Sequence, residues 1–168
     1  MIFTPHWGVE YVHAARPEQE GLARAAIEAG AVAVIGNHPH VLQPWERHVA
    51  ADGREGFIAY SLGNFVSGQH ELPRRTSVIL VLGLAQDAAG DLVVSGARYV
   101  PLAMTNNAGL GRSPAHGVDA TDRVGATAHA AHAASILPVG AALPATAQLT
   151  GGSACDGHRR LTAVDDPG

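Results

Sequence analysis

Two short segments of the sequence carry histidines at spacings that suit metal binding. His38 and His40 flank Pro39, and His6 lies near the start of the chain. Because Pro39 fixes its own φ and disfavours helical geometry at His38, we expect an extended segment here. Residues two apart in an extended segment face the same side, so His38 and His40 predict a pair of imidazole ligands. Neutral imidazole suits transition metals such as Zn and Fe better than Ca or Mg.

These histidines follow two predicted strands that a helix connects. Met1–Thr4 forms a short apolar strand ahead of His6, and Ala31–Ile35 forms a buried strand ahead of the His-Pro-His segment. Between them, Pro17–Ala29 has the proline start, acidic first turn and apolar spacing of a helix. A right-handed crossover makes the two strands parallel neighbours whose ends share one edge of the sheet. We therefore predict that His6 and the two later histidines converge at this edge, where open α/β sheets bind ligands.

Two further polar residues are candidates for the same site. Glu10 comes four residues after His6 and is a candidate metal ligand, partner of a ligand, or general acid/base. The alternative is an exposed carboxylate without a role, which is the ordinary case for glutamate. Asn64 follows a predicted strand and is a candidate for hydrogen bonding to the site loops or to a substrate. Ser61 lacks the Gly-x-Ser-x-Gly context of a hydrolase nucleophile.

The remaining pattern favours antiparallel strands. Trp45–Ala50 and Gly56–Leu62 flank one glycine-containing turn, and Thr76–Gln86 and Leu92–Met104 flank another. We predict an α/β fold in which a mixed sheet has one crossover helix and antiparallel strands. One helix covers only one face of a sheet, whereas parallel strands need cover on both faces. We therefore expect the chain to be part of a larger domain with a missing N-terminal half.

The aromatic residues mark a boundary along the chain. All of the Phe, Trp and Tyr residues lie in positions 1–99, and alanine, glycine and proline dominate afterwards. We predict a domain over residues 1–108 and a largely disordered tail over 109–168, with a short helix near 126–136. His129 and His132 lie in that helix, and we expect them to be solvated residues rather than metal ligands.

Composition excludes several classes of protein. Eleven basic and 15 acidic residues give a net charge of −4, which does not fit a general nucleic-acid binder. The single cysteine, Cys155, rules out an internal disulfide and a multi-cysteine zinc site. We expect no membrane span in this chain and no signal peptide or anchor, because the apolar runs are too short for either.

Four motifs together resemble the CapA family of bacterial capsule and poly-γ-glutamate synthesis proteins. They occur in the family's order over residues 1 to about 101: His6-Trp7-Gly8-Val9-Glu10-Tyr11, then Pro17 and Gln19, then Gly36-Asn37-His38-Pro39-His40-Val41-Leu42-Gln43-Pro44, and then Tyr60-Ser61-Leu62-Gly63-Asn64-Phe65. The resemblance implies a partial calcineurin-like metallophosphoesterase sandwich with a centre of two divalent ions (Mn, Zn or Fe). It also implies that His38 and His40 are the closing ligand pair and that His6 is the isolated strand-end ligand.

The resemblance also sets functional expectations. The family's earlier Asp and Asn ligands have no counterpart here, so we expect this chain alone to hold at most one ion. The implied activity is metal-dependent hydrolysis of a phosphoester, with Glu10 or His6 as the proton-transfer residue. The implied partner is an anionic cell-envelope polymer or a phosphoester, since the family works in the cell envelope. Two alternatives remain: a non-catalytic module that handles an envelope polymer, and an inactive truncated remnant.

Overall fold

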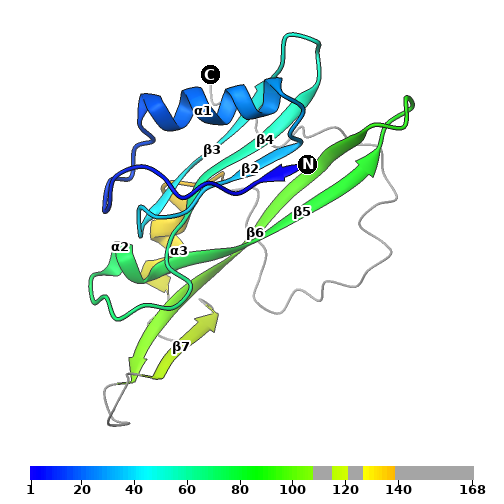
Figure 1. Cartoon of the computed structure of the whole chain (residues 1–168). Coiled ribbons are helices and arrows are strands. Elements are labelled where there is room, and N and C mark those ends of the chain that lie inside the picture. Colours follow the sequence, from blue (N-terminus) through cyan, green and yellow to red (C-terminus); the bar gives the residue numbers. More distant parts are fainter. Residues whose placement is uncertain (108–114, 121–126, 139–168) are drawn as a thin grey trace.

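The described part of the chain combines a mixed sheet, an antiparallel sheet and three helices (Figure 1). A computed structural model describes residues 1–107, 115–120 and 127–138. The mixed sheet has the strand order β1 (Ile2–Phe3), β2 (Ala33–Ile35), β4 (Glu55–Leu62) and β3 (Leu42–Val49). The second sheet has the order β5 (Thr76–Gln86), β6 (Leu92–Asn107) and β7 (Ala115–Ala120). The helices are α1 (Pro17–Glu28), α2 (Leu72–Arg75) and α3 (Thr127–Ala134).

The strand pairing confirms the predicted mixed sheet with one crossover. β1 and β2 are parallel, with Ile2 opposite Ala33 and Phe3 opposite Val34, and α1 connects them. β2 also pairs in parallel with β4, whereas β3 pairs antiparallel with β4 across the predicted hairpin. The ends of β1 and β2 therefore lie at the same edge of the sheet, as the position of the candidate site requires.

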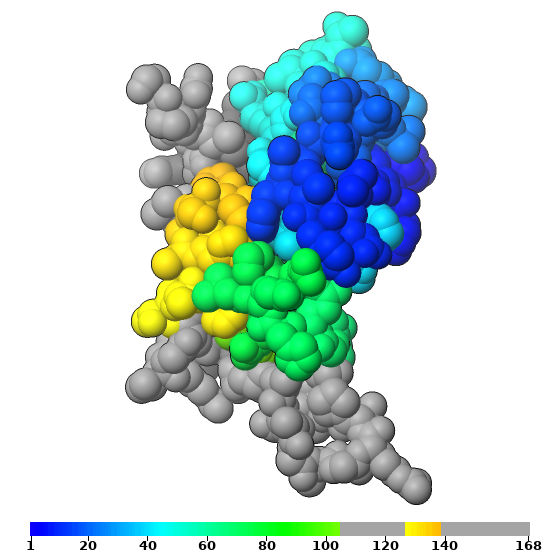
Figure 2. Space-filling view, turned by 90° about the vertical axis from the view of Figure 1, so that its left-hand side faces the viewer, coloured from blue at the N-terminus to red at the C-terminus, as the bar shows by residue number. Residues whose placement is uncertain are grey.

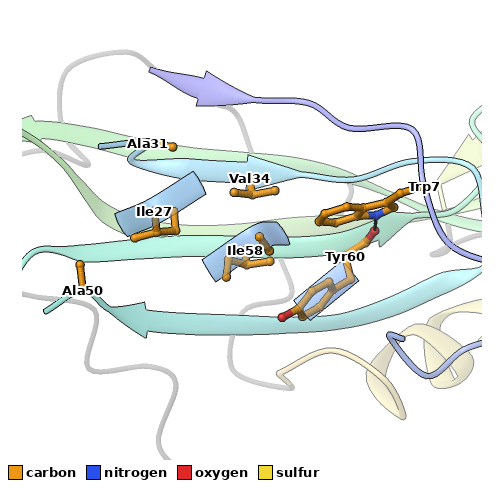
Figure 3. Packing of buried hydrophobic residues seen from close by; sticks show 8 residues of the cluster. Trp7, Ile27, Ala31, Val34, Ala50, Ile58 and Tyr60 are labelled. Atoms are coloured by element: carbon orange, nitrogen blue, oxygen red, sulfur yellow. Dashed lines mark hydrogen bonds between the residues drawn. The ribbon is translucent and has the colours of Figure 1, made fainter. Parts of the chain in front are cut away.

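Helix α1 covers one face of the mixed sheet. Its buried residues Gln19, Ala23 and Ile27 are four positions apart and so share one face of the helix. Ile27 packs in a cluster with Val34 of β2 and Ile58 of β4, among others (Figure 3). Helix α1 has 12 residues.

No helix among the described residues is long and apolar enough to cross a membrane.

The antiparallel sheet covers the opposite face of the mixed sheet. Phe57 and Ala59 alternate with the residues that face α1, so they point to the other side of β4. There they pack with Ala33 of β2 against Val94 and Ala97 of β6. The single predicted helix leaves this face to be covered by a larger domain, but β5 and β6 already cover it. Both faces of the mixed sheet are therefore packed within the described residues.

Helix α3 packs against both sheets, although it lies within the predicted tail. Ala133 and nearby Leu137 are buried with Leu42 of β3, Val78 of β5 and Tyr99 of β6. The helix falls within the predicted range 126–136, and β7 pairs with β6. Most of segment 109–168 lies outside the described residues, so the domain boundary at residue 108 stays a prediction.

The environment of His129 corrects one expectation. The side chain is 6% exposed rather than solvated. The hydroxyl of Thr76 donates to the Leu72 carbonyl at 2.8 Å, so it accepts a hydrogen bond from Nδ1 of His129 at 2.7 Å. Burial, followed by the charge of Arg75 and by His132, lowers the pKa of His129. His129 therefore belongs to the packed interface between α3 and β5.

Candidate metal site at the strand ends

The segments that leave β1 and β2 run side by side at the edge of the sheet. The amide of Asn37 donates to the carbonyl of Pro5 at 3.0 Å, and the amide of Trp7 donates to the carbonyl of Asn37 at 3.0 Å. These two bonds place His6 beside Asn37 as a parallel bridge. The predicted convergence of the two strand ends is thus present in the backbone.

Gly36 allows three segments to meet directly behind the site. The indole nitrogen of Trp7 donates to the carbonyl of Tyr60 at 2.9 Å (Figure 3). A Cβ at Gly36 would overlap both the Tyr60 carbonyl oxygen and the Trp7 indole nitrogen. The absence of a side chain at this position therefore lets the His-Pro-His segment leave β2 against β4 and the Trp7 ring.

The backbone of the His-Pro-His segment differs from the prediction. His38 has φ 105° and His40 has φ 60°, so the expected extended conformation is wrong. Tyr11 has φ 66°, and its amide donates to the carbonyl of Pro39 at 2.7 Å. Positive φ at a residue other than glycine costs about 1–3 kcal/mol and is concentrated at functional sites. Three such residues meet here, each next to or among the candidate ligands.

The imidazole rings nevertheless gather at one place. The ring centroids of His6 and His38 are 4.5 Å apart, and those of His38 and His40 are 6.0 Å apart. Nε2 of His40 lies 3.7 Å from Oε1 of Glu10. One ligand atom each from Glu10, His38 and His40 lies within 4.8 Å of the other two. His6 is outside that group of three, although its ring is next to His38.

This donor set fits a transition-metal ion. Two imidazoles and one carboxylate form a catalytic zinc set that leaves a position open for water. Ligand atoms at about 2.0–2.2 Å from one ion are at most about 4.4 Å apart, so small movements of Glu10, His38 and His40 would close their 4.8 Å spacing around it. Glu10 is exposed and the two histidines are half-buried, so the group faces solvent.

Asn64 fixes the orientation of His40. Its Nδ2 donates to the carbonyls of His40 at 3.2 Å and Arg74 at 3.0 Å, which uses both amide hydrogens. Its Oδ1 therefore accepts the 2.6 Å hydrogen bond from Nδ1 of His40. With the proton on Nδ1, neutral His40 presents the lone pair of Nε2 toward Glu10. The predicted hydrogen bonding of Asn64 to the site loop is present, and its amide hydrogens are not free for a substrate.

Two buried glutamines hold the segment that carries Glu10, a role that the sequence did not reveal. Nε2 of Gln19 donates to Oε1 of Gln43 at 2.9 Å, and Nε2 of Gln43 donates to the carbonyls of Val12 and Ala14 at 2.9 and 3.2 Å. Oε1 of Gln19 accepts from the amide of Arg16 at 3.0 Å. The sequence feature that could have revealed this role is Gln19, a polar residue at a core position of α1, four residues before Ala23.

Tyr11 and Arg74 extend the site beyond the predicted residues. The Tyr11 ring stacks on His40, with centroids 5.9 Å apart and planes 28° apart. The guanidinium carbon of Arg74 lies 3.6 Å from the centroid of the same tyrosine ring. Figure 2 shows the corresponding contact between the blue N-terminal residues and the green residues around α2. Local sequence patterns do not indicate this contact, because its partners are far apart along the chain.

Comparisons with known proteins cover the part of the chain that holds this site. Residues 1–69 match the model of the bacterial capsule synthesis protein family PGA_cap. The chain is 45% identical over 69 residues to the capsule biosynthesis protein CapA of Bacillus anthracis, covering 41% of this chain and 16% of that protein. It is 37% identical over 95 residues to the PGA biosynthesis protein CapA of Bacillus subtilis, covering 56% of this chain and 24% of that protein.

The matched region spans about a quarter or less of the length of these relatives. It nevertheless contains all of the candidate ligands, His6, Glu10, His38 and His40, together with Asn64. The motifs predicted from sequence and the site assembled by the fold therefore lie in the same segment as the family match. Over residues 1–69, this chain is similar to the bacterial capsule synthesis protein family PGA_cap.

Proposed function

We propose that this chain contributes part of a divalent-metal site to a protein of capsule or poly-γ-glutamate biosynthesis. The observation that carries the proposal is the group formed by Glu10, His38 and His40 at the shared end of β1 and β2. The family match supports the biological process. The two packed sheets and the strand-end histidines support a calcineurin-like metallophosphoesterase fold, and the family supports a place in the cell envelope.

The proposed reaction is hydrolysis of a phosphoester, either in a small substrate or in an anionic envelope polymer. Glu10, His38 and His40 would hold Mn, Zn or Fe, and His6 beside them is either a further ligand or the proton donor to the leaving oxygen. When bound, such an ion lowers the pKa of a coordinated water and polarises a phosphoryl oxygen. Asn64 keeps Nε2 of His40 available as a ligand atom.

Metal titration of the chain tests this proposal. We expect calorimetry with Zn or Mn to show weak binding of at most one ion, because the described residues offer three clustered ligands rather than a complete two-ion centre. The double variant His38→Ala/His40→Ala should abolish binding. His48→Ala is the matched control, since His48 pairs with Glu28 far from the site. Unchanged affinity in the double variant would contradict the proposal.

The same titration separates the two roles of His6. If His6 is a ligand, His6→Ala should weaken metal binding about 10-fold or more; if it is a proton donor, the affinity should stay unchanged. Turnover of p-nitrophenyl phosphate by the chain alone should be negligible, because a two-ion mechanism needs further ligands. Robust turnover by this chain would show that a partial centre is sufficient and would overturn the two-ion account.

A further inference from the structure

A stack of three planar groups leads outward from the candidate ligands. His40 stacks on the ring of Tyr11, and the guanidinium of Arg74 lies over the same ring. Tyr11 is 40% exposed, so the stack lies at the surface of the protein. A partly exposed positive charge is therefore held one aromatic ring away from His40.

Arg74 is held in place relative to the ligands. Its carbonyl accepts a hydrogen bond from Nδ2 of Asn64, and the same nitrogen donates to the carbonyl of His40. One side-chain amide thus links the backbone of α2 to the His-Pro-His segment. Together with the stacking on Tyr11, this link fixes the guanidinium before any ligand arrives, which reduces the entropy lost on binding.

The acidic partner of Arg74 is weakly held. Nη1 of Arg74 lies 3.0 Å from Oε2 of Glu71, whose side chain is 63% exposed. Exposed ion pairs of this kind contribute about 0–1 kcal/mol. By contrast, Arg24 makes two hydrogen bonds to Glu46, which also accepts one from Tyr60. An incoming anion can therefore replace Glu71 far more easily than it could replace Glu46.

We propose that Arg74, supported by Tyr11, is an anion-binding subsite for a phosphate or carboxylate group. A guanidinium presents a planar set of donors that matches either anion with two parallel hydrogen bonds. Glu71 occupies this position in the free chain and is displaced by the ligand. Only one part of this inference rests on the proposed function, namely that the anion belongs to the substrate. A polyanionic substrate would then place one charged group at the ion and another at Arg74.

Anion titration of the full chain, with a chelator present, tests the subsite without any metal. The probes are inorganic phosphate and a short glutamate peptide, and the readout is the NMR shift of the Arg74 side-chain NH with each. Arg74→Gln should weaken binding about 10-fold, the value of a charge-assisted pair. Arg74→Lys keeps the positive charge but lacks the planar set of guanidinium donors, so it should weaken anion binding about 3-fold. In these variants binding is followed by calorimetry.

Substitution of Glu71 is the more stringent test, because the proposal predicts that anion binding becomes tighter. Glu71→Gln should tighten anion binding about 2- to 5-fold by removing the competing carboxylate. Arg54→Gln is the matched control, since Arg54 pairs with Asp52 at the turn between β3 and β4; it should leave binding unchanged. Weaker binding in Glu71→Gln, or unchanged binding in both Arg74 variants, would overturn the proposal. A preference for phosphate or for the peptide identifies which anion the subsite takes.

The two proposals fail separately. His38→Ala should weaken Zn binding and keep the metal-free anion binding, because His38 is not part of the stack of His40, Tyr11 and Arg74. Arg74→Lys should keep Zn affinity within about 2-fold, because Arg74 is not a ligand. Anion binding without Zn binding would refute the metal site alone. Zn binding without anion binding would refute the subsite alone.

Discussion

Asn64 and His40 are joined by two hydrogen bonds in opposite directions. Nδ1 of His40 donates to the side-chain oxygen of Asn64 at 2.6 Å, and the side-chain nitrogen of Asn64 donates to the His40 carbonyl at 3.2 Å. The first bond sets the tautomer of the imidazole, and the second holds the backbone that carries it. Since His40 sits at φ 60°, this pair also retains a backbone conformation that histidine rarely adopts.

Removing the Asn64 amide should weaken metal binding. We expect Asn64→Ala to lower Zn affinity about 10- to 100-fold, as is typical when the hydrogen-bond partner of a ligating histidine is lost. Asn64→Asp keeps an oxygen for Nδ1 but loses both donors, so it should retain the tautomer. Nitrogen chemical shifts of His40 in the metal-free chain report the tautomer directly. A proton on Nε2 in the unmodified chain would contradict the assigned role.

Substitution of Gly36 should destabilise the fold from the edge of the sheet. The methyl group of Gly36→Ala would overlap the carbonyl of Tyr60 and the indole of Trp7, and such overpacking costs about 1–3 kcal/mol of folding stability. Gly21 of α1 is the matched control, because a Cβ there meets no atom within 4 Å. Gly21→Ala should stabilise the chain by up to about 1 kcal/mol through helix propensity. Urea unfolding of both variants measures the difference, and equal stabilities would contradict the packing argument.

The half-buried carboxylate of Glu46 should make stability fall in acid. Burial alone would raise its pKa, but hydrogen bonds from Arg24 and Tyr60 lower the pKa of Glu46 below its ordinary value of 4.5. A carboxylate with a lowered pKa in the folded state stabilises the protein above pH 4.5, and this contribution is lost as the pH falls further.

The comparison of Glu46→Gln with the unmodified chain checks this sign. The variant should be less stable at pH 7, and the difference in urea midpoint should shrink as the pH drops from 5 to about 3. Glu18→Gln removes an exposed charge at the start of α1 and serves as the control. A difference that stays constant over this pH range would show that Glu46 has the same pKa in both states.

Docking of α3 should weaken as the pH falls through the range where histidine titrates. Burial is the main cause that lowers the pKa of His129 below its ordinary value of 6.5. Below pH 6.5 the unfolded chain binds a proton at His129 that the folded protein excludes. The contribution of His129 to stability is therefore fully present above pH 6.5 and declines below it. Hydrogen exchange of the α3 amides from pH 7.5 to 5 measures this, after correction for the intrinsic rate.

His129→Asn keeps a donor for Thr76 without a titrating group. Its α3 protection should therefore be independent of pH over the same range, even if it is lower throughout. The same decline in the variant and in the unmodified chain would assign the effect to another group, with the neighbouring His132 the first to test, since its pKa is also lowered by burial and by His13.

Sequence predicted the parts of the site that depend on local pattern. The strand–helix–strand unit follows from apolar spacing and from Pro17 and Gly30 at the helix ends, and it brings His6 next to His38. The positive φ values at 38 and 40 escaped prediction, because tertiary bonds such as that from Tyr11 to Pro39 impose them against local preference. For the same reason, the cover of the mixed sheet by β6 depends on long-range packing that periodicity does not encode.

The glutamine pair that joins α1 to β3 has a consequence for how the carboxylate side of the site is assembled. Gln19 sits in the first turn of α1, and through Gln43 it anchors the stretch that delivers Glu10. His38 and His40 directly follow β2, whereas the segment after Glu10 is also held by the first turn of α1. Metal binding should therefore depend in part on helix attachment: fraying of the first turn would release Val12 and Ala14 from Gln43 and leave Glu10 anchored through the bond from Tyr11 to Pro39.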